Sequence, residues 1–173
     1  RRLDELTARI DPARAQHFFG EAPEWSSTVY LCCADTQGHA VSFIQSNYEG
    51  FGSGIVIPGT GIAMQNRGAG FINQPGHPNH LAGGKRPYHT IIPAFTTKNG
   101  AAHMSFGVMG GPMQPQGHLQ VLSRVVASGR DPQAALDAPR WRVDGGLNIS
   151  VEPDTPPSTV TALQALGHNI TVA

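Results

Sequence analysis

Residues 28–46 read TVYLCCADTQGHAVSFIQS, two β-prone apolar runs on either side of a short turn that contains glycine. This pattern is typical of a β-hairpin. A turn centred on Gln37-Gly38 would place Asp35 opposite Ala40. The adjacent cysteines Cys32-Cys33 lie inside the first apolar run, where a mutual disulfide would be strained, so we expect them to be small core residues.

The same pairing predicts a polar cluster at the open end of this hairpin. Thr28 would lie opposite Asn47 and beside Ser46, directly after residues 20–27, which have the composition of an extended linker. In an N-terminal-nucleophile hydrolase, a side-chain hydroxyl is activated by the α-amine of its own residue, which peptide-bond cleavage must expose. Cleavage of the Ser27–Thr28 bond would create that arrangement. The alternative is an ordinary β-branched residue at the start of a strand.

The rest of the chain predicts further hairpins and short helices. Residues 91–108 indicate a second hairpin around Asn99-Gly100, residues 51–64 one or two short strands, and residues 66–90 a long loop. We expect helices at residues 3–10, 116–128, 132–138 and 158–166, and strands at 148–151 and 169–172. This order predicts an α+β fold with a mostly antiparallel sheet covered by helices.

Composition excludes several classes of partner. The 173 residues carry 12 basic and 12 acidic side chains, so there is no electrostatic signature for nucleic acid or for an anionic membrane surface. No run of eighteen apolar residues and no signal peptide is present, and the sequence begins with Arg1 rather than Met. The compartment, cytoplasmic or periplasmic, stays open.

Several ordered motifs carry a family resemblance. Residues 28–71, followed by GKRPYHTIIPA, MGGP and DAPRW, make the chain from Ser26 to Ala173 similar to the small subunit of the γ-glutamyltranspeptidase (glutathione hydrolase) family. The resemblance implies a four-layer αββα sandwich, autocatalytic cleavage before a nucleophilic threonine, and an acyl-enzyme resolved by water or an amine. It implies no cofactor.

The resemblance also implies a division of the chain. Residues 1–27 would be the end of the large-subunit region with its linker, and residues 28–173 the small-subunit catalytic region, truncated at its C-terminus. The expected partners are the large-subunit segment of the same precursor and a small amide or γ-glutamyl substrate, with a heterodimer after cleavage or a higher oligomer. Because residues 1–27 share a chain with Thr28, we expect an uncleaved precursor, a fragment or a member unable to process.

Residue by residue, the resemblance assigns the catalytic roles. Thr28 matches the nucleophile, and Ser46 falls where the family has a second threonine hydrogen-bonded to it; we expect Ser46 and Asn47 to orient Thr28. Gly110 and Gly111 match the glycine pair whose N–H groups form the oxyanion hole, which is reasonable because a strained turn must present these groups without a Cβ.

The recognition residues depart from the family. Ala69 stands where γ-glutamyl enzymes carry an acidic residue for the substrate ammonium, and His89 and Thr90 stand where they carry a serine pair for the carboxylate. A buried ammonium without a counter-ion is costly, so we expect an amidase with a different acyl group. Arg67, beside Ala69, could hold an acidic group of the substrate.

Two rivals remain at this point. One is an enzyme that keeps γ-glutamyl transfer despite Ala69, with Arg67, His89 or large-subunit groups for recognition. The other is a non-catalytic relative that keeps the fold as a structural or binding protein and never cleaves. His77 and His80 are spaced like zinc ligands, but no third ligand has recognisable spacing, so no metal site is expected.

Overall fold

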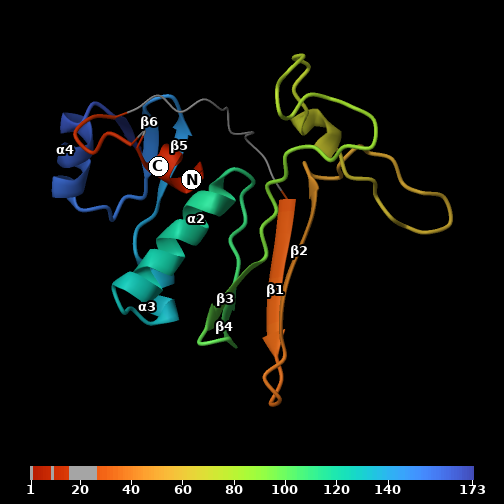
Figure 1. The fold of residues 1–173 in the computed structure, drawn as a ribbon, viewed down its shortest axis with the longest axis horizontal. Coiled ribbons are helices and arrows are strands. Elements are labelled where there is room, and N and C mark those ends of the chain that lie inside the picture. The colour runs from red at the N-terminus through yellow and green to blue at the C-terminus, as the bar shows by residue number, and fades with distance from the viewer. Residues whose placement is uncertain (1, 9, 16–26) are drawn as a thin grey trace. The chain divides into compact units, whose positions relative to one another are not determined.

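The computed structural model describes residues 2–8, 10–15 and 27–173 and combines helices with strands (Figure 1). The chain divides into Pro23–His118, the central unit, and Arg1–Ala22 with Leu119–Ala173, the terminal unit. The mixture of hairpins and helices confirms the expected α+β class. Of the linker expected at residues 20–27, residues 20–26 lie outside the described residues and Ser27 belongs to a strand.

The central unit contains two antiparallel hairpins, as predicted. They are built from β1 (Ser27–Ala34), β2 (Ala40–Tyr48), β3 (Ala94–Lys98) and β4 (Ala101–Phe106). Beside them lies a long, mostly irregular segment with one short 3-10 helix, η1 (Arg67–Gly70).

The turn of the first hairpin differs from the prediction by one residue. Ala40 lies opposite Ala34, not opposite Asp35. The Asp35 carboxylate accepts the backbone N–H of His39 at 2.9 Å and contacts the His39 ring at 2.8 Å, and Gly38 has a φ of 87°. The aspartate therefore closes a three-residue loop with glycine in the left-handed region. An odd loop length moves the whole register by one position.

That shift changes what lies beside Thr28. Thr28 pairs with Ser46, and the predicted pairing with Asn47 was wrong. Ser27 pairs with Tyr48, so Asn47 is the extra residue of a β-bulge. Tyr48 has a φ of 79°, which is strained for a residue with a Cβ. The irregular backbone therefore lies at the open end of the hairpin, next to Thr28, the second residue of β1.

The second hairpin follows its sequence signal. Asn99 and Gly100 have φ values of 54° and 81°, as the predicted Asn-Gly turn requires. The two hairpins are joined through Ser42, whose hydroxyl donates to the carbonyl of Ala94 at 2.8 Å. Tyr30 reaches the same place, since its hydroxyl lies 2.9 Å from the Ser42 oxygen. Because the Ser42 hydrogen is already donated, Tyr30 is the donor in that contact.

The glycine-rich segment forms no regular strand. Only an isolated bridge joins Val56 and Ala63, so the one or two strands expected at residues 51–64 were wrong. Four of its glycines, Gly52, Gly54, Gly59 and Gly61, have φ between 65° and 76°. Repeated left-handed residues turn the chain too often for a ladder to extend. Residues 66–90 form the predicted loop, apart from η1 and one bridge.

The terminal unit contains the predicted C-terminal helix and strands. Its elements are α1 (Arg2–Thr7), α3 (Pro132–Asp137), α4 (Pro157–Ala165) and the sheet β5 (Trp141–Gly145), β6 (Asn148–Val151) and β7 (Asn169–Val172). Helix α2 (Met113–Leu122) begins in the central unit and continues as a π-helical turn, Ser123–Ala127. β6 and β7 are parallel, with α4 between them in the chain. Strand β5 was not predicted.

The two units differ in the side chains that they bury. The buried apolar residues among those described, Ala135, Ile149 and Val151, all belong to the terminal unit, which also buries Gln120. In the central unit the buried side chains are polar: Thr28, Arg67, Thr90, Gln114 and His118. Cys32 and Cys33 are exposed and unpaired with each other, which corrects their assignment as core residues. Buried polar groups need partners or a function.

Candidate functional site

Thr28 lies at the start of a core strand with its side chain almost fully enclosed. It is 8% exposed, and its Cα partner across the hairpin is Ser46. The Ser46 oxygen accepts the backbone N–H of Tyr48 at 3.0 Å, which fixes that hydroxyl within the bulge. The structure therefore brings Thr28 and Ser46 together, as predicted. Asn47 is displaced into the bulge, and its carbonyl accepts the N–H of Asn66 at 3.1 Å.

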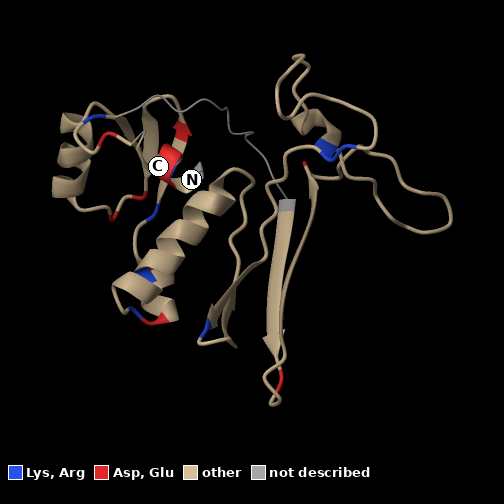
Figure 2. Ribbon diagram, in the orientation of Figure 1, with Lys and Arg blue, Asp and Glu red and all other residues tan. Residues whose placement is uncertain are grey.

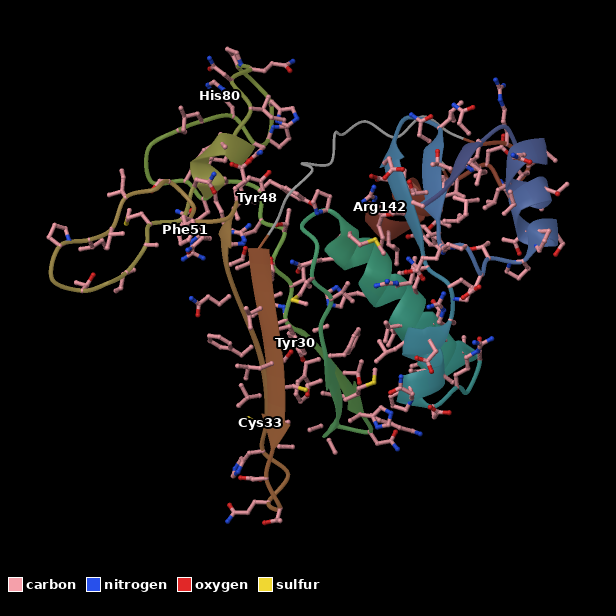
Figure 3. The ribbon with its side chains drawn as sticks, turned by 180° about the vertical axis from the view of Figure 1, so that it is seen from behind. Tyr30, Cys33, Tyr48, Phe51, His80 and Arg142 are labelled. Atoms are coloured by element: carbon pink, nitrogen blue, oxygen red, sulfur yellow. The ribbon has the colours of Figure 1, made fainter. Side chains whose placement is uncertain are left out.

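This backbone contact brings the η1 turn to the open end of the hairpin. Arg67, which begins η1, is 5% exposed, and its guanidinium carbon lies 5.5 Å from the centre of the Tyr48 ring. Figure 3 shows Tyr48 at the end of β2 beside this loop. Stacking over an aromatic face suits the planar guanidinium. Tyr48 was not predicted as a site residue.

Thr90 joins the same cluster. One terminal nitrogen of Arg67, Nη1, donates to the Thr90 hydroxyl at 3.1 Å, and Thr90 is 6% exposed. The other terminal nitrogen, Nη2, is buried and has no hydrogen-bond partner among the described residues. Burial lowers the pKa of Arg67, but a guanidinium titrates so far above neutrality that it stays charged.

His89 is a neutral neighbour of this charge. Partial burial, together with the positive charges of Arg67 and Arg86, lowers the pKa of His89. A histidine with a lowered pKa is uncharged at neutral pH and does not compete with Arg67 for an anion. Arg67 and Thr90 are therefore in contact, and the exposed His89 lies within the electrostatic range of Arg67. Ala69 is exposed on η1 and adds no charge there.

The predicted oxyanion glycines lie immediately before α2. Gly110 and Gly111 have φ values of 113° and 56°, and their carbonyls accept the N–H groups of Met113 and Gln114 at 3.0 Å. Both conformations favour glycine, and a Cβ on Gly110 would lie 3.2 Å from the Met113 Cβ. The carbonyls start the helix, while the N–H groups of both glycines precede its ladder.

Tyr30 links the Thr28 face to the segment that leads to these glycines. A Cβ on Gly107 would lie 2.2 Å from the Tyr30 ring, so the ring packs directly on this backbone. Figure 3 shows Tyr30 on the side of the hairpin that faces β3 and β4. Thr28 lies two residues before Tyr30, on the same face of β1. Gly110 lies three residues after Gly107 along the chain.

Gln114 is a further polar residue that the sequence analysis missed. It is fully buried, and its side-chain oxygen accepts the N–H of Ile92 at 2.9 Å, which ties the segment after Thr90 to the first turn of α2. Its side-chain nitrogen has no partner among the described residues. A glutamine after GGPM carries no recognised motif, so only its burial reveals this role.

The described residues contain no group of three potential metal ligands. His77 and His80 instead support the loop, since a ring nitrogen of His77 accepts the N–H of Asn79 at 3.0 Å and His80 lies 3.3 Å from the carbonyl of Ile72. No helix in the described part of the chain is long and apolar enough to span a membrane.

Comparison with known proteins identifies the relatives of this arrangement. The model of the γ-glutamyltranspeptidase family matches residues 1–173. An oxamate amidohydrolase proenzyme of Klebsiella pneumoniae subsp. pneumoniae is 39% identical over 98% of this chain and 33% of its own length. Other curated relatives are named glutathione hydrolase and acylase proenzymes. The chain spans between 23% and 33% of the length of these curated relatives.

Solved structures give the same result. A cephalosporin acylase from Bacillus halodurans matches with a TM-score of 0.86 and 53% identity, over 98% of this chain and 31% of that chain. An acivicin-inhibited γ-glutamyltranspeptidase matches with a TM-score of 0.73 and 25% identity, over 83% of each chain. These relatives are hydrolases or transferases, and the curated ones are named as proenzymes.

Proposed function

The chain belongs to the γ-glutamyltranspeptidase family, and from this premise we propose that it is the catalytic region of an amide hydrolase or acyltransferase whose nucleophile is the Thr28 hydroxyl. The observation that carries the proposal is the position of Thr28, buried near the open end of the first hairpin and directly opposite Ser46. A strand residue with only a packing role does not need a second hydroxyl facing it beside a bulge.

The reaction begins with cleavage of the Ser27–Thr28 bond, which frees the α-amine of Thr28. This amine takes the proton of the Thr28 hydroxyl while the hydroxyl oxygen attacks the carbonyl carbon of the substrate. The tetrahedral intermediate collapses, the carbon–nitrogen bond breaks, and the proton passes to the leaving amine. Water, with the same α-amine as base, then hydrolyses the ester of Thr28; an acceptor amine in place of water gives transfer.

We assign the oxyanion hole to the backbone N–H groups of Gly110 and Gly111. Tyr30 packs on Gly107 and Thr28 lies two residues away, about 7 Å along the strand, which supports the approach of this segment to the nucleophile. Loss of one such donor costs roughly 10²–10³-fold in rate in other acyl-transfer enzymes. Ser46 orients the Thr28 hydroxyl, and the backbone of Asn47 holds the recognition loop rather than the nucleophile.

The proposed architecture is the four-layer αββα sandwich, completed by a large-subunit segment of the same precursor. Residues 1–27 would end that segment and residues 28–173 would form the small-subunit region. The outward face of the first hairpin supports a covering partner, because four exposed apolar residues lie on it: Val29, Leu31, Val41 and Phe43, of which Leu31 and Phe43 are directly opposite each other. Proenzyme names among the relatives are consistent with this division.

The proposed substrate is an amide without the free α-amine of a glutamyl group. The absence of an acidic side chain at Ala69 and the buried charge of Arg67 both disfavour an ammonium in this part of the site. One relative is named for oxamate, an amide that has an adjacent carboxylate and no α-amine, which supports a substrate of this kind. The rivals are retained γ-glutamyl transfer and a non-catalytic relative that never cleaves.

A small amide panel tests the proposal in the protein as its source cell makes it. γ-Glutamyl amides, dicarboxylic monoamides and hydrophobic acyl amides are incubated with the wild type and with Thr28→Ala. We expect hydrolysis of at least one non-glutamyl amide by the wild type and none by Thr28→Ala. Equal rates in both proteins would remove Thr28 as nucleophile, and a preference for γ-glutamyl amides would favour the first rival.

A further inference from the structure

Arg67 is a buried cation with unused hydrogen-bonding capacity. It is 5% exposed and takes part in no ion pair with a described residue. A guanidinium carries five N–H donors in a planar fork, and the side chain of Arg67 donates one of them to Thr90, while Nη2 has no partner among the described residues. The carboxylate of Glu49, which accepts from the side chain of Asn66 at 2.8 Å, belongs to an exposed residue.

A buried charge in this state needs an anion. An unpaired buried ion is expensive, and the fork of arginine matches a carboxylate through two parallel hydrogen bonds. Figure 2 shows a basic η1 turn, and the turn itself contains no acidic residue. Tyr48 covers one face of the guanidinium, which leaves its edge as the direction in which an anion can bind.

Thr90 provides a second donor for the same anion. Its hydroxyl oxygen accepts from Arg67, so its own O–H hydrogen remains for a different acceptor. His89, with its lowered pKa, is neutral and adds no second cation at neutral pH. Donors without a matching acceptor therefore converge around Arg67.

The cluster is close enough to the nucleophile to read the acyl part of a substrate. Tyr48 lies two residues after Ser46, which pairs with Thr28, a separation of roughly 6–7 Å along a strand. The leaving amine must depart to water first, so the enclosed part of the site holds the acyl group that stays on Thr28. An anion at Arg67 would then be a few bonds from the scissile carbonyl.

We infer that Arg67 and Thr90 bind a carboxylate on the acyl side of the substrate, so that the enzyme acts on monoamides of short dicarboxylic acids that lack an ammonium group. This assignment rests on the proposed role of Thr28, and it names the group that distinguishes the substrate. The cation of Arg67 attracts the carboxylate and repels an α-ammonium on the same carbon chain.

The test separates charge recognition from structural support. Rates with oxamate, succinamate and glutaramate are compared with those for butyramide and glutamine in wild type, Arg67→Gln, Thr90→Val and the control Lys98→Gln. We expect Arg67→Gln to lower kcat/KM for the best carboxylated amide on the order of 10²-fold, with butyramide changed less than about threefold. Lys98→Gln, which removes an exposed charge at the β3 turn, should match wild type.

A binding measurement keeps the result independent of catalysis. Titration of succinate or glutarate into Thr28→Ala protein should show saturable heat that Arg67→Gln abolishes, while melting curves verify that each variant is folded. Equal losses for carboxylated and neutral amides, or dicarboxylate binding unaffected by Arg67→Gln, would overturn the inference and leave Thr28 untouched. Carboxylate binding with full activity in Thr28→Ala would instead refute the proposed nucleophile.

Discussion

At the scale of single residues, the site is defined by polar side chains enclosed where apolar ones would be expected. Thr28, Arg67 and Thr90 are each more than nine-tenths buried in a unit whose described residues include no fully buried apolar side chain. Burial of such groups costs free energy unless they are satisfied, so their retention points to chemistry rather than packing. The strained φ of Tyr48 lies at the same place.

Ser46 provides a prediction for the orientation of the nucleophile. Ser46→Ala removes the hydroxyl opposite Thr28 and leaves the N–H of Tyr48 without its acceptor. We expect kcat to fall about tenfold or more, the equivalent of a hydrogen bond worth about 1.4 kcal/mol, with KM little changed. Ser46→Thr should recover most of this loss. A Ser46→Thr protein as slow as Ser46→Ala would contradict an orienting role.

His118 provides a prediction for pH dependence. It is 8% exposed, and burial lowers its pKa, which outweighs the opposite effect of the backbone of Gln114. The unfolded chain therefore binds the proton at a higher pH than the folded chain does, so the free energy of unfolding falls as pH decreases below about 6.5.

Thermal melts between pH 7.5 and 5 check this expectation. His118→Phe keeps the edge-on ring contact with Phe106, at 5.3 Å between centroids, and removes the titrating group. The variant should lose less stability on acidification than wild type, whereas the exposed His103→Gln should behave as wild type. If the melting temperature of all three proteins fell by the same amount on acidification, His118 would not be the group that binds a proton on unfolding.

Much of the site could be predicted from residue types, and part of it could not. Thr28, Ser46 and the glycine pair stand in recognisable motifs, and the basic character of Arg67 beside Ala69 was visible in the sequence. Tyr48, Gln114 and His118 were missed because their importance comes from a bulge and from burial. Both depend on contacts between residues far apart in the chain.

At the scale of elements, local turn chemistry decided which predictions succeeded. Asn99-Gly100 has its own strong turn preference, and the second hairpin formed where expected. The first hairpin shifted because the side chain of Asp35 selects the loop length. Helix α2 begins at Met113, before the predicted Gln116, because Pro115 is tolerated in a first turn. Strand β5 alternates apolar Trp141 and Val143 with two charged residues, but the run is too short to stand out in the sequence, and pairing with β6 completes the strand.

The contact between Tyr30 and Gly107 tests how the hairpins pack. In Gly107→Ala the new Cβ would meet the Tyr30 ring at 2.2 Å, so we expect a loss of about 1–3 kcal/mol in the free energy of unfolding. Denaturant unfolding measures it. Gly83→Ala, where a Cβ meets nothing within 4 Å, is the matched control.

A second substitution makes the cause specific. In the Tyr30→Ala background the ring is gone, and Gly107→Ala should then cost much less than it does alone. Additive costs in the double variant would mean that the clash is not with Tyr30.

At the scale of the whole molecule, the chain spans a third or less of the length of these curated relatives. The first hairpin has one face toward β3 and β4, and on its opposite face exposed apolar residues include the cross-strand pair Leu31 and Phe43. Such a face in a family of processed precursors fits the proposed large-subunit partner.

Leu31 tests this covering. It is exposed here at 49%, opposite Phe43, and Leu31→Ser in the protein as made by its source cell should lower the free energy of unfolding by about 1.5–3 kcal/mol if a partner segment buries it. Leu136→Ser, at an exposed leucine of α3, should change it little. Identical thermal melts for the two variants would argue that the hairpin face stays in solvent.

The most direct measurement of the central claim is the N-terminal sequence of the mature polypeptide that carries the site, read by mass spectrometry in wild type and in Thr28→Ala. We expect a polypeptide that begins at Thr28 in the wild type and, in the variant, a chain that remains uncut after Ser27. An active protein with the Ser27–Thr28 bond uncut, or a cut at another position, would contradict it.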